Sequence, residues 1–264
     1  MSEGVQLVIP MAGEGRRFLN AGVQTPKPLI DVGGIRMFEL VIANLISAEV
    51  SQIVLIVRAE FELESIALQM EQKLGVPIKL VSVEQTTLGP AKSVALTEDL
   101  LQANAPVVVA NSDQYVRFDP KYFYETLVKG ISCSGVILTM EDDDPQWSYA
   151  DLTADNDVIR VVEKQVVSPY ATVGIYGFRR ASEMFRAFEE MERMGDKVGG
   201  EFYVGPAYNY LSKLEGPVKS MNLGPVGLIM HGLGTPDDLK RFLATSDSAA
   251  AIRRARAILA PTIS

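Results

Sequence analysis

Short apolar runs alternate with helical patterns through the first half of the chain, and this alternation constrains the fold more than any other feature of the sequence. Unbroken apolar runs are typical of strands that are buried on both faces, and the segments between them repeat with helical spacing. Such alternation predicts a largely parallel sheet that is covered by helices on both faces. The expected strands are residues 5–10, 53–57, 78–83 and 107–110, and the expected helices are residues 37–45 and 61–74.

The second half of the chain has a less regular pattern. Its apolar runs lack regular helices between them, which predicts antiparallel strands added to the same sheet. No internal repeat or flexible linker marks a second independent domain, so we expect a single domain with a Rossmann-like, three-layer α/β/α fold and a mixed, mostly parallel sheet. The expected strands here are residues 135–140, 158–163 and 172–178, and the expected helices are residues 181–194, 203–214, 237–244 and 248–259.

The net charge of the chain is −8, which disfavours nucleic acid or an anionic membrane as a partner. A phosphate-rich ligand must therefore be held by a local group of positive side chains. The sequence has no run of about 18 apolar residues, and its acidic start at residues 1–4 leads directly into an expected strand. We therefore expect neither a membrane span nor a signal peptide, which favours a soluble, cytoplasmic protein.

The chain has one cysteine, Cys133, and one histidine, His231. A single cysteine excludes an intramolecular disulfide, and the two residues together do not suffice for a zinc site built from such ligands. A metal ion in this protein would be a hard cation held by carboxylates, and Mg²⁺ is the natural candidate. We interpret both Cys133 and His231 as structural residues.

The loop after the first expected strand carries the clearest sign of a binding site. Ligands of open α/β sheets bind beyond the carboxyl ends of the strands. Gly13 and Gly15 allow the backbone to turn tightly towards a phosphate, and the adjacent Arg16 and Arg17 add positive charge that pairs well with phosphate oxygens. The loop lacks the third glycine of a dinucleotide-binding fingerprint, since Phe18 occupies that position. Alone, it fits an anion site or an ordinary turn equally well.

Lys27 lies between two prolines a short distance after this loop. Because proline restricts the backbone, the ammonium of Lys27 is directed rather than mobile. The combination of residues 10–18 with residues 26–29 resembles the opening of the sugar-phosphate nucleotidyltransferases, and the resemblance continues along nearly the whole chain. Within that family the sequence is most similar to a bacterial branch found with capsule or surface-polysaccharide genes, because of residues 147–150 and 200–204.

The resemblance implies an enzyme with a nucleotidyltransferase, GT-A-like fold. Its reaction would transfer a nucleoside monophosphate from an NTP to a phosphorylated acceptor, with a sugar 1-phosphate as the expected acceptor, and would release pyrophosphate. Arg17 would hold the β- and γ-phosphates, and Lys27 would stabilise charge at the α-phosphorus. Asp113 would bind Mg²⁺, which bridges phosphate oxygens.

The other site residues also follow from the resemblance. Residues 85–91 are similar to the segment that reads the base, and residues 162–164 and 172–176 match segments that line the acceptor site, where Lys164 would meet the phosphate and Glu163 the hydroxyls. The expected nucleotide-binding residues are Ala12, Gly13, Glu14, Gly15, Arg16, Gln85, Gly89, Pro90, Ala91 and Ser112. The expected acceptor-binding residues are Trp147, Tyr149, Glu163, Lys164, Gly174 and Glu201. The single domain would comprise a nucleotide-binding half at about residues 1–120, an acceptor-binding half at about residues 121–235 and C-terminal helices at residues 236–264.

One position departs from the family pattern. The family often has an aspartate, as a second metal ligand, where this chain has Gly232 just before the late turn at residues 233–236. Either Asp113 alone among the carboxylates holds the metal, or Asp237 or another residue substitutes. The second ligand therefore stays unassigned.

Less specific interpretations stay open for several residues. Asp113 is compatible with a turn aspartate, Glu163 and Lys164 with a surface pair, and Trp147 and Tyr149 with aromatic packing of a loop. Two other functions also fit parts of the pattern: a GT-A-type glycosyltransferase that consumes a nucleotide-sugar, and a non-catalytic relative that binds nucleotide. Where the first class typically has an Asp-x-Asp motif, the corresponding stretch here is Ser112-Asp113-Gln114-Tyr115, which disfavours it. The retained Arg17, Lys27 and Asp113 disfavour the second. The identity of the NTP and of the acceptor, and whether the chain forms a homo-oligomer, are left open.

Overall fold

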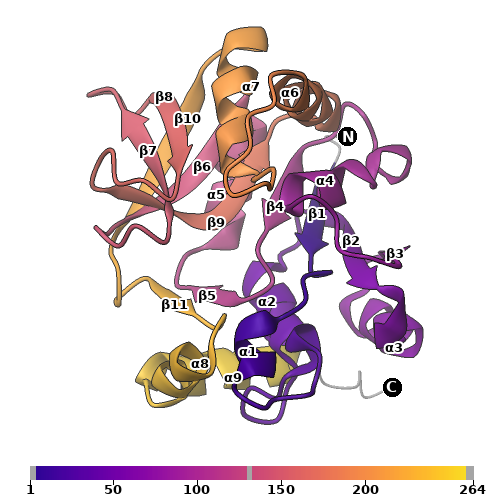
Figure 1. Cartoon of the computed structure of the whole chain (residues 1–264). Helices are drawn as coiled ribbons and strands as arrows, with labels where there is room; N and C mark the ends of the chain where they lie inside the picture. The colour runs from indigo at the N-terminus through magenta and orange to yellow at the C-terminus, as the bar shows by residue number, and fades with distance from the viewer. Residues whose placement is uncertain (1–3, 130–132, 260–264) are drawn as a thin grey trace.

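The computed structural model describes residues 4–129 and 133–259 of the chain (Figure 1). Residues 1–3, on which most of the prediction about the acidic N-terminus rests, lie outside the described residues, as do residues 260–264 of the expected C-terminal segment. Among the residues described, no helix is both long enough and apolar enough to span a bilayer.

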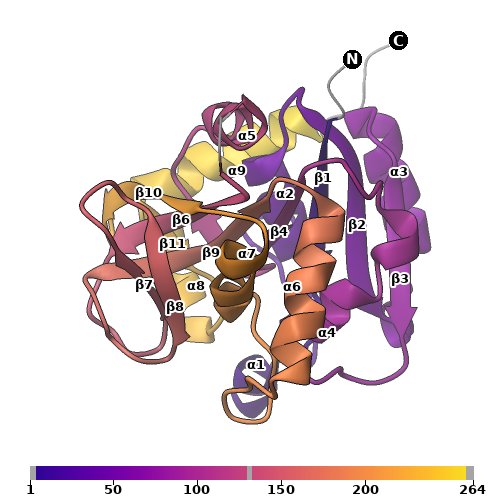
Figure 2. The ribbon, with the colours of Figure 1, turned by 90° about the horizontal axis from the view of Figure 1, so that it is seen from above.

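A mixed sheet forms the middle layer of the molecule (Figure 2). Strand β1 (Val5–Pro10) lies between β2 (Val50–Arg58) and β4 (Val107–Ala110) and runs parallel to both. Strand β3 (Ile78–Val83) extends this parallel part beyond β2. On the other side, β9 (Tyr170–Phe178) is antiparallel to β4 and so joins the parallel part to the strands of the second half.

The second half of the chain adds the antiparallel strands predicted from its irregular pattern. Strand β9 also pairs with β6 (Gly135–Glu141), which has the parallel edge strand β10 (Val218–Pro225) on its other side. Strands β7 (Ser148–Leu152) and β8 (Val158–Glu163) form a hairpin that joins the sheet through β9. Within the described residues these nine strands make up one sheet, which confirms the predicted fold class.

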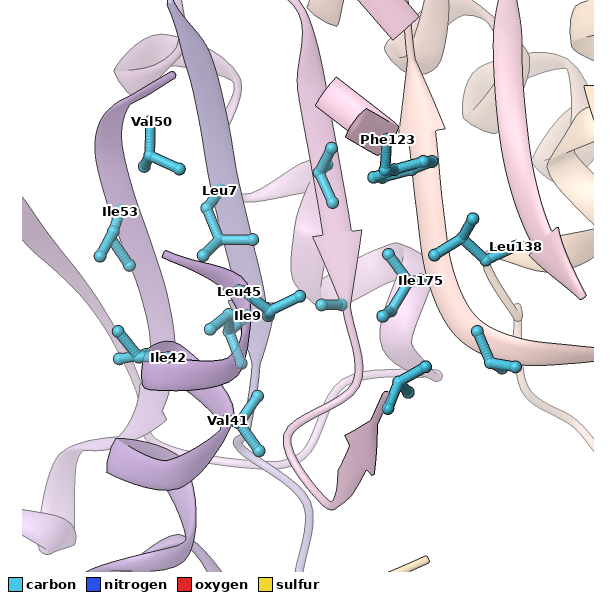
Figure 3. Packing of buried hydrophobic residues seen from close by; sticks show 14 of the residues in the cluster. Leu7, Ile9, Val41, Ile42, Leu45, Val50, Ile53, Phe123, Leu138 and Ile175 are labelled. Atoms are coloured by element: carbon cyan, nitrogen blue, oxygen red, sulfur yellow. The ribbon is translucent and has the colours of Figure 1, made fainter. Parts of the chain in front are cut away.

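Alternate residues of the central strands point to opposite faces of the sheet. Leu7 and Ile9 of β1 pack into the buried apolar cluster of one face, and Val8 packs into that of the other. Figure 3 shows Leu7 and Ile9 beside Leu45 of the first-face helix α2. The helices of the first face are α2 (Met37–Leu45), α3 (Glu64–Leu74) and α5 (Pro120–Lys129), and those of the second are α4 (Pro90–Ala95), α6 (Ala181–Arg193) and α7 (Tyr208–Leu214) (Figure 2).

The chain continues into two helices that close a third buried cluster. These are α8 (Pro236–Leu243) and α9 (Ser246–Ile258), and a separate antiparallel pair of short strands, β5 (Gln114–Val116) and β11 (Met230–Gly232), lies next to them (Figure 1). The cluster unites residues from the two ends of the chain. Its buried members are Phe18, Ile30, Val32, Met37, Leu40, Ala43, Leu233, Phe242, Ala251 and Ala255.

The sequence pattern missed several elements, most of them short. The helix predicted from residue 203 begins only at Tyr208, after a 3-10 turn η4 (Gly205–Ala207), because Pro206 lacks an amide hydrogen and restricts the residue before it. The helix predicted from residue 61 likewise begins at Glu64. The unpredicted elements are α1 (Arg16–Asn20), α4, α5, β5, β7, β10, β11 and the 3-10 turns η1 (Lys27–Leu29), η2 (Ala59–Phe61), η3 (Glu98–Leu100) and η4.

Candidate active site

A cavity opens at the carboxyl ends of β1 and β4, where the sequence predicted a phosphate site. Its volume is about 470 Å³, which lies within the range of roughly 300–1,000 Å³ that small-molecule sites occupy. The predicted residues that line it come from segments far apart in the sequence. They are Ala12, Gly13, Glu14, Gly15, Arg16, Lys27, Gly89, Pro90, Ser112, Asp113 and Glu201.

Gly15 shapes the loop that follows β1. Its φ of +66° lies in the left-handed region that favours glycine, and the residue caps the start of α1. A Cβ atom at this position would lie 3.1 Å from the Cβ atom of Lys27. Glycine therefore lets the loop pack directly on the turn that carries Lys27. Gly13 has a different role, since among the described residues no atom lies within 4 Å of a Cβ built there, and its missing side chain keeps the cavity open.

Lys27 and Asp113 meet at the wall of the cavity. Lys27 begins the 3-10 turn η1 between its two prolines, and Asp113 lies just after β4. The ammonium of Lys27 donates a hydrogen bond to Oδ2 of Asp113, and the two side chains are only 21% and 29% exposed. The structure thus brings together two of the three residues, Arg17, Lys27 and Asp113, for which the sequence predicted the charge chemistry of the site.

The late turn before α8 closes on Asp113. The amide of Leu233 donates to the carbonyl oxygen of Asp113 at 2.7 Å. A Cβ atom at Gly234 would lie 2.8 Å from Oδ2 of Asp113 and 4.0 Å from Nη1 of Arg17. Arg17 is exposed and does not line the cavity, but its guanidinium lies beside the same turn as the Asp113 carboxylate. A second cation therefore stands close to the same carboxylate.

The surroundings of Asp113 fit a magnesium ion with a single protein carboxylate. Nowhere in the described ranges do three Asp, Glu, His or Cys side chains gather in a way that could hold a metal ion. A Cβ atom at Gly232 would lie 3.7 Å from the carboxyl carbon of Asp238, whose oxygens already accept hydrogen bonds, and Asp237 is exposed. Mg²⁺ commonly takes one or two carboxylates and completes its shell with substrate phosphates and water. Asp113 would supply one such carboxylate.

Backbone pairing holds the predicted base-reading segment against Phe202. The amide of Phe202 donates to the carbonyl of Leu88 at 2.8 Å, and the amide of Ala91 donates to the carbonyl of Phe202 at 3.0 Å. Gly89 has a φ of +106°, and a Cβ atom there would lie 2.6 Å from the carbonyl oxygen of Phe202. Only glycine fits this close approach, which brings Glu201 to the cavity wall.

Hydroxyl side chains of this segment face the cavity in place of Gln85. Gln85 is exposed and does not line the cavity, whereas Thr86, Thr87 and Ser93 do, and the last two hydroxyl oxygens are 2.7 Å apart. Ala91 is buried beneath the cavity wall. The two threonines directly after Gln85 were the sequence signal for hydroxyl groups at this part of the cavity wall. The other lining residues that were not among the expected site residues are Pro10, Met11, Pro28 and Asn111.

Glu163 and Lys164 lie at the end of β8, outside the set of residues that line the cavity. The buried carboxylate of Glu163 accepts a hydrogen bond from the Ser148 hydroxyl. Lys164 has a φ of +55°, and its ammonium donates to the Tyr203 hydroxyl and lies 4.6 Å from the centre of the Tyr203 ring. Tyr203 follows the cavity residue Glu201 closely in the chain. This unpredicted contact links the end of β8 to the cavity wall.

Burial raises the pKa of Glu163, and the Ser148 hydrogen bond offsets only part of that effect. The folded protein therefore holds this proton to a higher pH than the unfolded chain, whose glutamates titrate near about pH 4.3. The contribution of Glu163 to stability should be present below that pH and should decline as the pH rises through the folded-state pKa. We expect the unfolding free energy of wild type minus that of Glu163→Gln to fall between pH 4 and pH 7, as measured by urea denaturation. A difference that is constant with pH would contradict this account.

The aromatic residues predicted at the acceptor site face the protein. The indole Nε1 of Trp147 donates to the carboxylate of Asp142 at 2.7 Å. Tyr149 is fully buried on β7, and its hydroxyl donates to the carbonyl of Asp144 at 2.8 Å. Both aromatic side chains pack on the first-face cluster. They tie the acidic turn to β7, which is the alternative of aromatic packing that the sequence left open.

Gly174 supports the site through its backbone. It is buried in β9 with a φ of +68°, and its carbonyl accepts a hydrogen bond from the amide of Asn111 at 2.9 Å. A Cβ atom there would overlap the Asn111 side-chain amide and lie 2.7 Å from Oε1 of Gln114. The position therefore holds the start of the segment that carries Asp113.

Gly174→Ala is expected to destabilise the fold by roughly 3 kcal/mol or more, because strain at positive φ adds to a clash in a packed core. Gly195→Ala is the matched control, since Gly195 also has a φ of +68° but has open space around it in the described structure. The Gly195→Ala substitution should lower the free energy of unfolding by about 1 kcal/mol. Chemical denaturation of both variants measures the two values. Equal losses of unfolding free energy in the two variants would show that the close contacts around Gly174 do not add to the effect of its positive φ.

A model of the nucleotidyl transferase family matches residues 7–202 of the chain. Among curated proteins, the mannose-1-phosphate guanyltransferase of Candida albicans is 30% identical over 169 residues, which cover 63% of this chain and 46% of that protein. The enzyme of the same name from Saccharomyces cerevisiae is 31% identical over 170 residues, again covering 63% and 46%. The chain thus spans about half the length of the curated relatives it matches.

Solved structures share the fold over a larger part of the chain. A nucleoside-diphosphate-sugar pyrophosphorylase from Vibrio cholerae RC9 has a TM-score of 0.76 at 23% identity, covering 90% of this chain and all of that one. An inositol-1-phosphate CTP transferase from T. maritima has a TM-score of 0.72 at 14% identity, covering 97% of each chain. At these identities the likeness is one of fold.

Proposed function

The chain belongs to the nucleotidyl transferase family, and on that premise we propose that it transfers a nucleoside monophosphate from an NTP to a phosphorylated small molecule and releases pyrophosphate. One observation carries the proposal. The paired Lys27 and Asp113 lie on the wall of a nucleotide-sized cavity, beside the glycine loop after β1. This arrangement offers a backbone suited to phosphate, a cation and a carboxylate suited to a metal ion in one place.

The proposed reaction brings two polyanions together. An oxygen of the acceptor phosphate attacks the α-phosphorus of the NTP and forms the new P–O bond, while the bond to pyrophosphate breaks. A phosphate nucleophile is already ionised at neutral pH, so no general base is needed. The task of the protein is therefore positioning and charge neutralisation, which are strong effects in a cavity partly closed to water.

Each part of that task has candidate residues. The loop backbone and Arg16 at the cavity wall would hold the outer phosphates, with Arg17 close by. Lys27 would stabilise charge at the α-phosphorus. Asp113 would hold Mg²⁺, which supplies charge neutralisation on the phosphate oxygens. The hydroxyls of Thr86 and Thr87 would contact the nucleoside. Gln85 would reach the base only if its loop moves towards the cavity.

A sugar 1-phosphate is the proposed acceptor. The support comes from the names of the curated relatives, which are mannose-1-phosphate guanyltransferases, and from the charged group formed by Glu163, Lys164 and Glu201. The hydrogen bond to Tyr203 would hold the ammonium of Lys164, which would meet the acceptor phosphate. Nucleotide-sugar supply for capsule or surface polysaccharide, in the cytoplasm where NTPs are made available, is the proposed setting. A homo-oligomer is compatible with this function.

A GT-A-type glycosyltransferase is the second candidate, because that class also binds nucleotides at the carboxyl edge of such a sheet. A nucleotide-binding protein without catalysis is the third. Pairing of Lys27 with Asp113 favours transfer chemistry over both, since neither alternative needs a directed ammonium at the α-phosphate.

A pyrophosphate-release assay separates these functions. The four common NTPs are each combined with Mg²⁺ and a panel of sugar 1-phosphates and other phosphorylated alcohols. We expect pyrophosphate to appear with at least one pair, and to depend on both substrates. Release of a nucleoside diphosphate from a nucleotide-sugar, without pyrophosphate from any pair, would identify a glycosyltransferase. Nucleotide binding by calorimetry without either product would identify the non-catalytic alternative.

A further inference from the structure

Helix α9 lies beyond the residues that the family model matches, and it touches the segments that carry Lys27 and Asp113. Its neighbours include α2 and α8, and Figure 1 shows the α8–α9 pair beside α1 and β11. One end of α9 meets the hairpin that follows Lys27. The other end meets the strand pair that follows Asp113. Both contacts join parts of the chain that are far apart in sequence.

The hairpin at residues 31–36 docks on the C-terminal part of α9. Arg256 donates a hydrogen bond through Nη2 to the carbonyl of Gly33 at 2.7 Å. Gly33 and Gly34 have φ values of +65° and +90°, and Cβ atoms there would lie 2.6 Å from Cδ1 of Ile252 and 2.7 Å from Nη2 of Arg256. The hairpin begins directly after η1, where the amide of Ile30 donates to the carbonyl of Lys27. A shift of the hairpin on α9 would therefore move Lys27.

The N-terminal part of α9 docks on the strands that follow Asp113. Asp247 lies in the first turn, with Oδ2 at 3.1 Å from Nε2 of His231 and Oδ1 at 3.8 Å from Nη1 of Arg117. His231 on β11 is paired with Tyr115 on β5, which is two residues after Asp113. The rings of His231 and Tyr115 are stacked with their centres 6.3 Å apart. Asp247 thus anchors the strand pair on which the backbone of Asp113 depends.

The connection between the two anchors is stiff. Asp247 and Arg256 are nine residues apart on one helix, so their backbones are separated by about 14 Å. Between them, Ala251 and Ala255 are buried in the third cluster, together with Phe18 of α1 and Leu233 of the late turn. Close packing transmits a displacement instead of absorbing it.

We propose that α9 is a brace of the active site, with Asp247 and Arg256 as positioning residues that hold Asp113 and Lys27 at their meeting distance. This inference rests on the proposed function. The brace explains why the third buried cluster contains residues from both ends of the chain, including Phe18 after the glycine loop and Leu233 of the late turn. It also assigns a role to His231, which relays the position of Asp247 to β5 and does not line the cavity.

Arg256→Ala tests the brace at its more exposed end. We expect kcat for pyrophosphate release to fall about tenfold, because small misplacements of a catalytic group are costly, while KM for the NTP changes less than about threefold. Arg256→Lys should recover part of the loss, since an ammonium can still donate to the Gly33 carbonyl. The matched control is Arg253→Ala, because Arg253 is exposed on the same helix and makes no hydrogen bond or ion pair with any described residue.

Hydrogen exchange supplies a readout that does not need enzyme activity. Amides of residues 30–37 should exchange faster in Arg256→Ala than in wild type or Arg253→Ala, while those of β2 should be unchanged. Faster exchange in the hairpin of Arg256→Ala, together with an unaltered kcat, would overturn the brace and leave the proposed function standing. Exchange rates equal to those of wild type would have the same consequence. A wild-type protein that releases no pyrophosphate, but whose hairpin loosens in Arg256→Ala, would overturn the proposed function while supporting the brace contact.

Discussion

Lys27→Met is expected to lower the turnover of pyrophosphate release by at least about a hundredfold, an effect typical of removing a charge-stabilising group from a preorganised site. Methionine keeps the length of the apolar stem but has no ammonium. The loss should be large here because Lys27 is directed by its flanking prolines, is only 21% exposed and needs no reorganisation to meet developing charge. The variant also leaves the Asp113 carboxylate without its partner, close to an incoming polyanion.

Lys92→Met is the control for Lys27→Met. Lys92 is partly exposed on α4, and its ammonium lies 2.8 Å from a carboxylate oxygen of Glu192, outside the residues that line the cavity. Its removal changes the net charge equally and should leave kcat within about threefold of wild type, as exposed ion pairs contribute little. If Lys27→Met kept more than a tenth of wild-type turnover, Lys27 would not be the group that stabilises the transition state.

Asp113→Asn is expected to have a comparable effect by a different route. The variant keeps the size of the side chain but removes the charge that a divalent cation requires, so both turnover and metal affinity should fall by about a hundredfold. Binding of Mn²⁺, followed by electron paramagnetic resonance in the presence of a non-hydrolysable NTP, measures the metal directly. This readout is independent of catalysis and therefore separates loss of the ion from loss of the fold.

Asp143→Asn is the matched control for Asp113→Asn, because Asp143 is exposed in the acidic turn before β7. It should bind Mn²⁺ as wild type does. Unchanged Mn²⁺ binding in Asp113→Asn would show that another residue holds the ion. Asp238 would then be the first residue to test, since its carboxyl carbon lies 3.7 Å from a Cβ atom built at Gly232, the position where the family often has its second metal ligand.

Much of the fold followed from local periodicity. The strands at residues 5–10 and 107–110 are unbroken apolar runs because helices cover both faces of the sheet, and that pattern is visible in the sequence itself. Lys27 was predictable for a similar reason, since the restriction by its flanking prolines is local to the chain. The carboxyl-edge rule then placed the glycine loop and Asp113 together before any contact was known.

Contacts between distant segments decided the features that the sequence missed. Strands β5 and β11 are too short to show a periodicity, and each exists because it pairs with the other across more than a hundred intervening residues. The positions of Thr86 and Thr87 depend on how Gly89 packs against Phe202. The aromatic side chain of Tyr149 could have contacted a ligand or packed in the core. It is buried because β7, which carries it, pairs with β8 in the sheet.

The sequence by itself determined the layered α/β architecture, the loop suited to phosphate and the residue types that carry charge there, because these properties depend on backbone geometry and neighbouring residues. Only the tertiary structure decided which of those charges meet. Lys27 reaches Asp113, Arg17 stays outside the cavity, and α9 supports both segments from the far end of the chain. Such distances follow from the packing of the whole core, and no local pattern of residues encodes them.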